Sequence, residues 1–159
     1  MKRSRFGNFM YNLTFKSAMF LNKHKWLYYI LNLTWGILLT LFGFIVTIVM
    51  LLCFRKPHKY HGIYYFEIGK RWGGFETGLM FVRDTTSTEH VSKHELGHTY
   101  QNAILGPFML GLVSIPSVIR YWYRKAKKPT TNYDDIWFEG GASDIGYAVV
   151  DGKEENNGY

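Results

Sequence analysis

Cysteine is nearly absent from this chain of 159 residues, and its scarcity excludes several kinds of site. The single cysteine, Cys53, cannot form an intramolecular disulfide, and zinc sites that need two or four thiolates are excluded for the same reason. A glycine-rich phosphate-binding loop, the Gly-x-Ser-x-Gly turn of serine hydrolases and internal repeats are also missing. A metal site in this chain would therefore have to be built from histidine and carboxylate.

Acidic residues are missing from the first 25 positions, which contain six basic ones: Lys2, Arg3, Arg5, Lys16, Lys23 and Lys25. Apolar residues are interspersed among them at loosely helical spacing, namely Phe6, Phe9, Met10, Leu13, Met19 and Phe20. This pattern predicts a basic amphipathic segment over 1–25 that lies against anionic headgroups, with a disordered basic tail as the alternative. The net charge of +7 does not indicate nucleic-acid binding, because no binding motif accompanies it.

Charged residues are also missing from 26–54. As one helix this stretch would measure about 43 Å, which exceeds the roughly 30 Å of a bilayer's hydrocarbon core. The sequence therefore predicts a transmembrane helix over 26–54, of which 35–54 alone would suffice; a helical hairpin is the alternative. Basic residues flank both ends, so the positive-inside rule does not orient the segment.

The strongest chemical signal is His94-Glu95-Leu96-Gly97-His98, an H-E-x-x-H motif. Two histidines four residues apart lie on one face of a helix, so both imidazoles can reach one metal ion. Glu95 projects from the adjacent edge, where a carboxylate can accept a proton from a water that the metal activates. Zinc suits such a site, because it binds imidazole and carboxylate tetrahedrally and leaves one position open.

The residues around the motif favour a helix. Thr86 and Glu89 have the spacing of a capping box, and Gly106-Pro107 is a strong stop signal. We therefore expect the motif to lie inside a helix of about five turns. The competing interpretation is a surface helix that carries two incidental histidines.

A tetrahedral site needs a third ligand from elsewhere in the chain. Glu139 is the first choice, on a short helix that could begin at Asn132. His90, one turn before His94, and Asp144 are the alternatives, and Asp144 could instead orient a histidine. Four tyrosines could stabilise an oxyanion, and the sequence does not choose among them: Tyr100, Tyr121, Tyr123 and Tyr133.

Two segments before the motif, 62–69 and 74–82, are expected to be strands joined by a hairpin-like turn at 70–73. Phe75, Thr77, Leu79 and Phe81 would then share one face. An edge strand at 74–82 could bind an extended peptide by β-addition. The alternative is that the strand packs against the motif helix and binds nothing.

A second apolar run, 102–119, is uncharged but is interrupted by Gly106, Pro107, Gly111 and Pro116. A complete crossing would separate the histidines from Glu139, and the charged stretch after the run could not cross back cheaply. The run is therefore expected to be re-entrant or interfacial, with a bend near Pro107 or between Gly111 and Pro116.

Beyond the metal motif, the chain resembles a group of small, largely uncharacterised bacterial membrane proteins. The resemblance rests on the following segments, spread over roughly 55–147: Trp72-Gly73-Gly74, His94-Glu95-x-Gly97-His98-Thr99-x-Gln101, Leu105-Gly106-Pro107, Gly111, Ile115-Pro116-Ser117 and Glu139. It implies a gluzincin-like zinc site with Glu139 as third ligand, in a bacterial cytoplasmic membrane. The chain departs from the pattern at Gly140 and Gly141, and at Ser143, where the family has an aspartate.

The sequence thus predicts an α+β, zincin-like domain over 55–150 that includes the dipping segment 102–119. It follows the basic segment 1–25 and the membrane helix 26–54, and a disordered tail, 151–159, ends the chain. The expected function is that of a membrane-bound zinc metallopeptidase with His94, His98 and Glu139 as ligands and Glu95 as base. The expected partners are a lipid membrane and a peptide substrate, and no nucleic acid. The alternatives are a metal-binding but inactive scaffold and a basic membrane adaptor.

Overall fold

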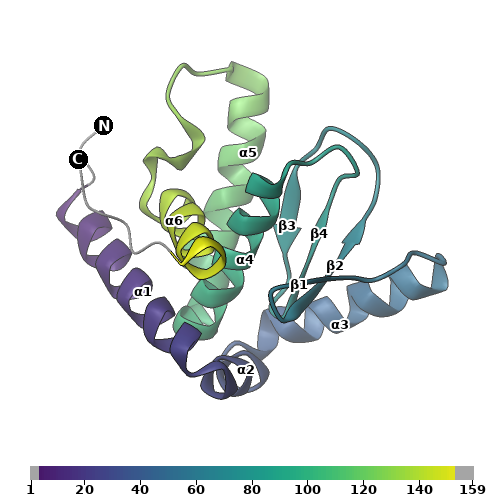
Figure 1. Cartoon of the computed structure of the whole chain (residues 1–159). Helices are drawn as coiled ribbons and strands as arrows, with labels where there is room; N and C mark the ends of the chain where they lie inside the picture. The colour runs from purple at the N-terminus through teal and green to yellow at the C-terminus, as the bar shows by residue number, and fades with distance from the viewer. Residues whose placement is uncertain (1–3, 153–159) are drawn as a thin grey trace.

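The computed structural model describes residues 4–152. The helical elements are α1 (Arg5–Lys23), α2 (Lys25–Leu33), α3 (Ile37–Leu52), α4 (Glu89–Leu105), the π-helical turn η1 (Leu110–Ser114), α5 (Ile115–Lys127), the 3-10 turn η2 (Tyr133–Asp135) and α6 (Trp137–Asp151). The strands are β1 (His58–Tyr60), β2 (Ile63–Glu67), β3 (Gly74–Glu76) and β4 (Met80–Arg83). Within this range, a four-stranded sheet lies at one side of a group of helices, with α4 beside it and α3 below it in the view of Figure 1, so the coarse α+β expectation is confirmed.

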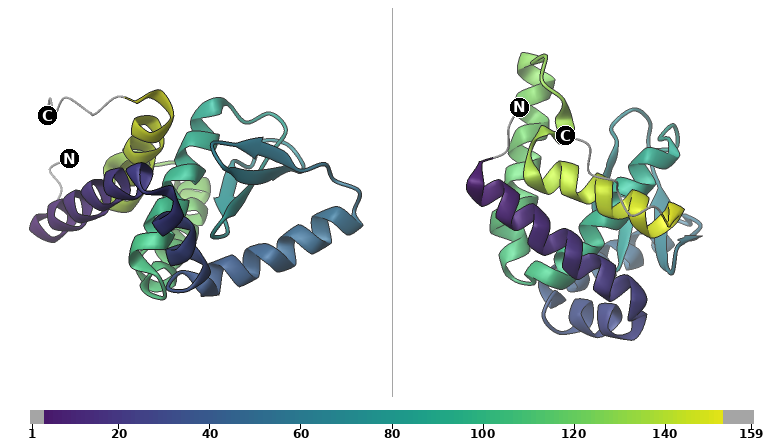
Figure 2. Two further views of the ribbon diagram at one scale, coloured as in Figure 1. Left: turned by 60° about the horizontal axis from the view of Figure 1, so that its bottom comes forward. Right: turned by 60° about the vertical axis from the view of Figure 1, so that its left-hand side comes forward.

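The motif helix α4 is the centre of the molecule. It lies between α1 and α6 on one side and the sheet on the other, as both further views show (Figure 2). Thirteen of its seventeen residues are buried, which no exposed amphipathic helix would show. The interpretation as a surface helix is therefore wrong. The helix ends at Leu105 as expected, but it begins at Glu89 with Thr88 as N-cap, because Thr86 instead donates its hydroxyl to Asp84.

Two glycines allow α4 and α6 to cross in backbone contact. A Cβ atom at Gly97 would overlap the carbonyl oxygen of Ala142, and one at Gly146 would overlap that of Lys93. Neither clash could be relieved by turning a side chain, since the opposing atoms are backbone. The closeness of the crossing is what carries Glu139, near the start of α6, to the histidines of α4.

We expect Gly97→Ala to lower the free energy of unfolding by about 3 kcal/mol or more, because one methyl group would push two helices apart in a packed core. Urea unfolding of the purified protein would measure the change. Gly111→Ala is the matched control: a Cβ there meets nothing within 4 Å, and alanine is the better helix former. Equal stability of the two variants would contradict this role for Gly97.

The sheet has the order β1-β2-β4-β3, in which β2 and β4 are parallel and the other pairs antiparallel. β1 and β2 form a hairpin through His61 and Gly62, which both have positive φ as a tight primed turn requires. The expected hairpin turn at 70–73 is wrong, because β2 and β3 are not neighbours. The expected single strand 74–82 is also wrong: it folds back at Thr77–Leu79, where Thr77 N–H donates to Met80 O and Gly78 has φ 81°.

The uncharged stretch 26–54 is not one continuous helix. α2 and α3 meet at an angle of 85° across a break at 34–36. A polar contact from α4 holds the break: Asn102 Nδ2 donates to Asn32 Oδ1 at 2.8 Å and to Gly36 O at 3.1 Å. A Cβ at Gly36 would lie 2.5 Å from that nitrogen, so only glycine admits the contact.

In the part of the chain that the structure describes, no single helix has both the length and the apolar composition needed to cross a membrane. Two bent pairs meet that criterion jointly: α2 with α3, and residues 89–108 with 110–127, whose axes differ by 115°. The break in the second pair falls at residue 109, two residues after Pro107, and Gly106, which has φ 55°, packs against Trp35. The expected bend near Pro107 is therefore confirmed.

The amino-terminal segment is helical from Arg5 to Lys23. One face of α1 is buried at helical spacing, through Gly7, Met10, Thr14, Ala18 and Leu21, and packs on α6 and α4. The alternative of a disordered tail is thus wrong for residues 5–23. Residues 1–3 and 153–159, which include Lys2, Arg3 and most of the expected tail, lie outside the described part.

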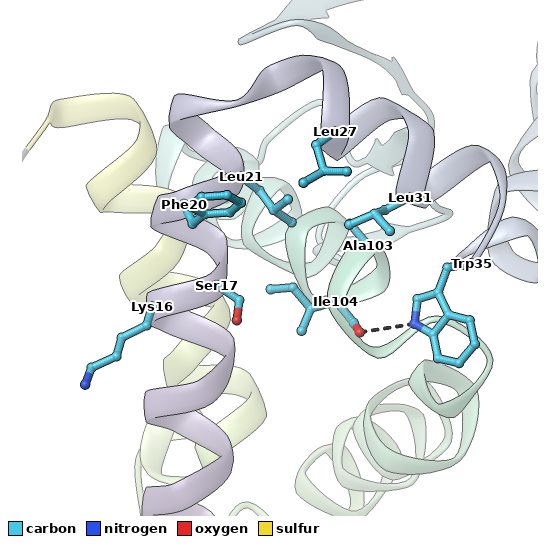
Figure 3. A pocket seen from close by; sticks show the side chains of 9 residues that line it. All are labelled: Lys16, Ser17, Phe20, Leu21, Leu27, Leu31, Trp35, Ala103 and Ile104. Carbon is cyan, nitrogen blue, oxygen red and sulfur yellow. Dashed lines mark hydrogen bonds between the residues drawn. The ribbon is translucent and has the colours of Figure 1, made fainter.

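A groove of about 660 Å³ lies where α1, α2 and the end of α4 meet (Figure 3). Its walls are mainly apolar, from Phe20, Leu27, Leu31 and Ile104, and Lys16 and Trp35 lie at its rim. The Trp35 Nε1–H donates to Ile104 O at 3.2 Å, which ties the α2–α3 break to the end of α4. None of the predicted metal ligands lines this groove.

Candidate metal centre

Three side chains from two helices meet in the core: His94 and His98 from α4, and Glu139 from the first turn of α6. Each offers one ligand atom, and these atoms lie within 4.8 Å of one another. All three residues are buried, and Glu139 has no exposed surface. This group could hold a metal ion, and it is the set that the sequence put first.

The spacing of the three atoms suits one small cation. His94 Nε2 lies 3.1 Å from His98 Nε2 and 3.1 Å from Glu139 Oε2, and His98 Nε2 lies 3.4 Å from the same oxygen. Tetrahedral bonds of about 2.0–2.2 Å to zinc would separate neighbouring ligand atoms by about 3.3–3.6 Å. Only small side-chain movements would therefore be needed for coordination.

Hydrogen bonds on the Nδ1 side of the imidazole determine that Nε2 of His94 faces the centre. Its Nδ1 lies 2.9 Å from Ser143 Oγ, and that hydroxyl donates to Asp134 Oδ2 at 3.3 Å. The hydroxyl oxygen is thus free to accept from Nδ1–H, which leaves the lone pair on Nε2. Ser143 therefore orients His94.

His98 is oriented in the same way from its own helix. Its Nδ1 lies 2.8 Å from Gln101 Oε1, while Gln101 Nε2 donates to Phe138 O at 2.9 Å. The second bond assigns the amide oxygen to the histidine, so the Nε2 lone pair of His98 also points inward. Gln101 connects the ligand on α4 to the residue next to the ligand on α6.

The carboxylate of Glu139 is the feature that calls for a cation. Both of its oxygens are buried and accept no hydrogen bond within the described residues. Burial alone would raise its pKa, but the nearness of His94 and His98 outweighs this and holds the pKa of the carboxyl well below its usual range. A buried, ionised carboxylate without a donor is costly unless a positive charge lies beside it.

The two imidazoles differ in their electrostatics. Burial lowers the pKa of His94. Burial also opposes the charged form of His98, but Glu139 and the charges of Glu95 and Glu76 raise the pKa of His98 to about 9. The centre therefore attracts positive charge, as a metal site with several carboxylates does.

Glu95 lies at the same centre without a partner of its own. It is buried, and in residues 4–152 no hydrogen bond or ion pair engages its carboxylate. Burial raises its pKa to about 8, against the lowering effect of His98. A carboxylate whose pKa lies near neutrality can take up a proton and release it again, as a general base must.

Sequence reasoning missed Glu76, a half-buried carboxylate on β3. Burial raises its pKa to about 7, while the charge of His98 and the N–H of Gly78 lower it. The signal that could have found it is an acidic residue inside an otherwise apolar strand segment, 74–82. A single strand over 74–82 would not single out Glu76, whereas the structure ends β3 at that residue.

Among the four candidate tyrosines, Tyr133 lies at the centre, with its ring centroid 6.1 Å from that of His94. Arg120 and Arg124 hold its turn by donating to the carbonyls of Tyr133 and Thr131, at 3.0 Å and 2.6 Å respectively. Burial and the charge of Glu139 raise its pKa, so the hydroxyl keeps its proton and can donate. Tyr100 instead bonds Asn22, and Tyr123 is exposed.

The alternative ligands lie outside the group. His90 is exposed, and its Nδ1 lies 3.0 Å from Tyr147 Oη. Asp144 accepts a hydrogen bond from Tyr11 Oη at 2.8 Å. The helix that carries Glu139 also differs from the expected one: Asn132 caps the separate turn η2, and α6 begins at Trp137 and runs for fifteen residues.

Comparison with models of known protein families, with curated proteins and with solved structures gives no match. The functional argument therefore depends on the chemistry of the centre itself.

Proposed function

We propose that this protein is a membrane-associated, zinc-dependent peptidase of the zincin type, with His94, His98 and Glu139 as metal ligands. One observation carries the proposal: the buried carboxylate of Glu139 lies 3.1 Å and 3.4 Å from two imidazole nitrogens and accepts no hydrogen bond from the part of the chain that the structure describes. Zinc is the metal chosen, because two imidazoles and one carboxylate leave a fourth tetrahedral position for water or substrate.

When bound, zinc would lower the pKa of a water molecule to about 7 and polarise the scissile carbonyl. The protein's own residues would do the rest. Glu95 would accept the proton from the attacking water and pass it to the leaving amine. Tyr133 would donate its hydroxyl hydrogen to the oxygen that develops negative charge, and Ser143 and Gln101 would keep the imidazoles aligned.

The substrate would lie along β3. This strand pairs with β4 on one side only, and it runs beside α4 next to Glu95. An extended peptide can add to such a free edge through backbone hydrogen bonds. Within the predicted segment 74–82, the edge available for this contact is therefore 74–76.

Metal analysis and peptide hydrolysis test the proposal. We expect about one zinc per purified chain and cleavage of members of a mixed peptide library, both lost on dialysis against a chelator and restored by one equivalent of zinc. Mass spectrometry of the peptides and plasma emission spectroscopy of the protein give the two readouts. Zinc without hydrolysis would favour the inactive scaffold, and absence of zinc would favour the adaptor.

We also propose that a lipid membrane is the protein's environment, in a bacterial cytoplasmic membrane. Large apolar side chains are exposed along α3 and α5, more than a water-soluble surface of this size carries. They are Leu38, Leu41, Phe42, Phe44, Ile45, Ile48, Val49, Leu51 and Leu52 on α3, and Ile115, Val118, Ile119, Trp122 and Tyr123 on α5. Anionic headgroups would complement the basic amino-terminal part, whose sequence contains no acid before Glu67.

Cysteine labelling tests how the chain lies in this membrane. In a Cys53→Ser background, single cysteines at positions 90 and 130, both exposed, should react with an impermeant thiol reagent from the same side. The physical reason is that α4 and α5 double back near Pro107, so residues 102–119 need not cross. Labelling from opposite sides would contradict the re-entrant arrangement.

A further inference from the structure

Glu76 faces the metal centre from β3. Side chains alternate along a strand, so Glu76 lies on the same face as Gly74, about 7 Å further along. That face is turned toward α4, because a Cβ at Gly74 would lie 2.8 Å from Glu95 Oε1. Phe75 points the other way and packs near Trp72, with 5.7 Å between ring centroids. Glu76 therefore lies beyond Glu95 in the direction of β3, and it is not one of the three clustered ligands.

Glu76 forms no ion pair within the described residues. Its Oε1 accepts the N–H of Gly78 at 2.7 Å. With a divalent cation at the centre, the charges of Glu139 and Glu95 would be balanced. The negative charge of the half-buried Glu76 would remain uncompensated. A positive group of the substrate would offset the cost of desolvating this carboxylate.

We propose that Glu76 binds the α-ammonium group of the peptide, so that the enzyme removes residues from the amino terminus; this rests on the proposed peptidase function. In a peptide's first residue the amine nitrogen is only about 2.5 Å from the carbonyl carbon. An amine-binding carboxylate must therefore lie close to the metal and the base, and Glu76 lies on the face of β3 that is turned toward α4 and Glu95. An internal peptide bond would place a neutral amide N–H there and leave the carboxylate without a counter-charge.

Two peptides of one sequence test the proposal, one with a free amino terminus and one with that terminus acetylated. The zinc-loaded wild-type protein should hydrolyse the first bond of the free peptide with a kcat/KM about 100-fold higher, as expected for a lost charge pair in a desolvated site. Glu76→Gln should bring this ratio close to one. Glu89→Gln is the matched control, an exposed carboxylate on α4 that should leave the ratio unchanged.

Calorimetry provides a readout that does not depend on turnover. The free peptide should bind to zinc-loaded Glu95→Gln protein about 100-fold more tightly than the acetylated one, and adding Glu76→Gln should remove the difference. Wild-type hydrolysis of both peptides at equal rates would overturn the role of Glu76 while leaving the peptidase intact. An equal loss on both peptides in Glu76→Gln would likewise overturn it, since that result indicates a structural role. Failure to hydrolyse any peptide would instead refute the peptidase function itself.

Discussion

Replacing Glu139 with alanine is expected to weaken zinc binding by more than about 100-fold, which exceeds the effect of losing a residue that only orients a ligand. His94→Ala and His98→Ala should abolish zinc binding, because the two ligands that remain in each variant are too few for a stable site. Within residues 4–152 no hydrogen-bond donor engages the carboxylate of Glu139, so its removal should affect the metal far more than the fold. Competition with a coloured zinc chelator measures the affinities.

Asp144→Ala is the control for this experiment. Asp144 lies on the same helix five residues later, but its carboxylate is engaged with Tyr11 and lies outside the ligand group. Its variant should bind zinc nearly as the wild type does. Wild-type affinity in Glu139→Ala, or an equal loss in Asp144→Ala, would show that Glu139 is not the third ligand.

The Glu95→Gln variant should retain zinc and lose hydrolysis, with kcat reduced by about 10²–10⁴-fold. Glutamine has the shape of glutamate but cannot accept a proton from water at neutral pH. Because the Glu95 carboxylate makes no hydrogen bond or ion pair within residues 4–152, the substitution removes no stabilising contact there. Steady-state kinetics with a cleaved library peptide, together with metal analysis, gives both readouts.

Glu89→Gln on the same helix is again the matched control, because its side chain is exposed and distant from the base by nearly two turns. A Glu95→Gln protein that hydrolyses peptide at the wild-type rate would refute the proposed base. Loss of zinc together with activity would show that Glu95 contributes to metal binding. Its role would then not be limited to accepting a proton from water.

The sequence predicts those features of the fold that are decided by short-range interactions. The helix over the motif follows from its own residues and from the stop at Gly106-Pro107, and helical geometry alone places His94 and His98 on one face. Glu139 was proposed because carboxylate completes such a ligand set, and α6 brings it to the two imidazoles. The ends of the helices were less well predicted, since Thr86 bonds Asp84 instead of capping α4.

The bend in the uncharged stretch is decided by a contact between residues distant in the chain. Residues 26–54 have the composition of one continuous span, and nothing among them requires a break at 34–36. The break depends on Asn102, which lies on α4 and bonds both Asn32 and Gly36. A buried amide must find partners, and here it finds them about seventy positions earlier in the chain.

The sequence alone predicts the helix that carries H-E-x-x-H, Glu139 as the first candidate to complete its pair of histidines, and long apolar stretches beside a basic end. Each of these depends on residues close in the chain or on composition. Tertiary structure alone decided that Ser143 and Gln101 orient the histidines, that 74–82 folds back at 77–79, and that 26–54 bends. These features depend on which helices can touch. The glycines at 97 and 146 permit a backbone contact between α4 and α6 that no local pattern announces.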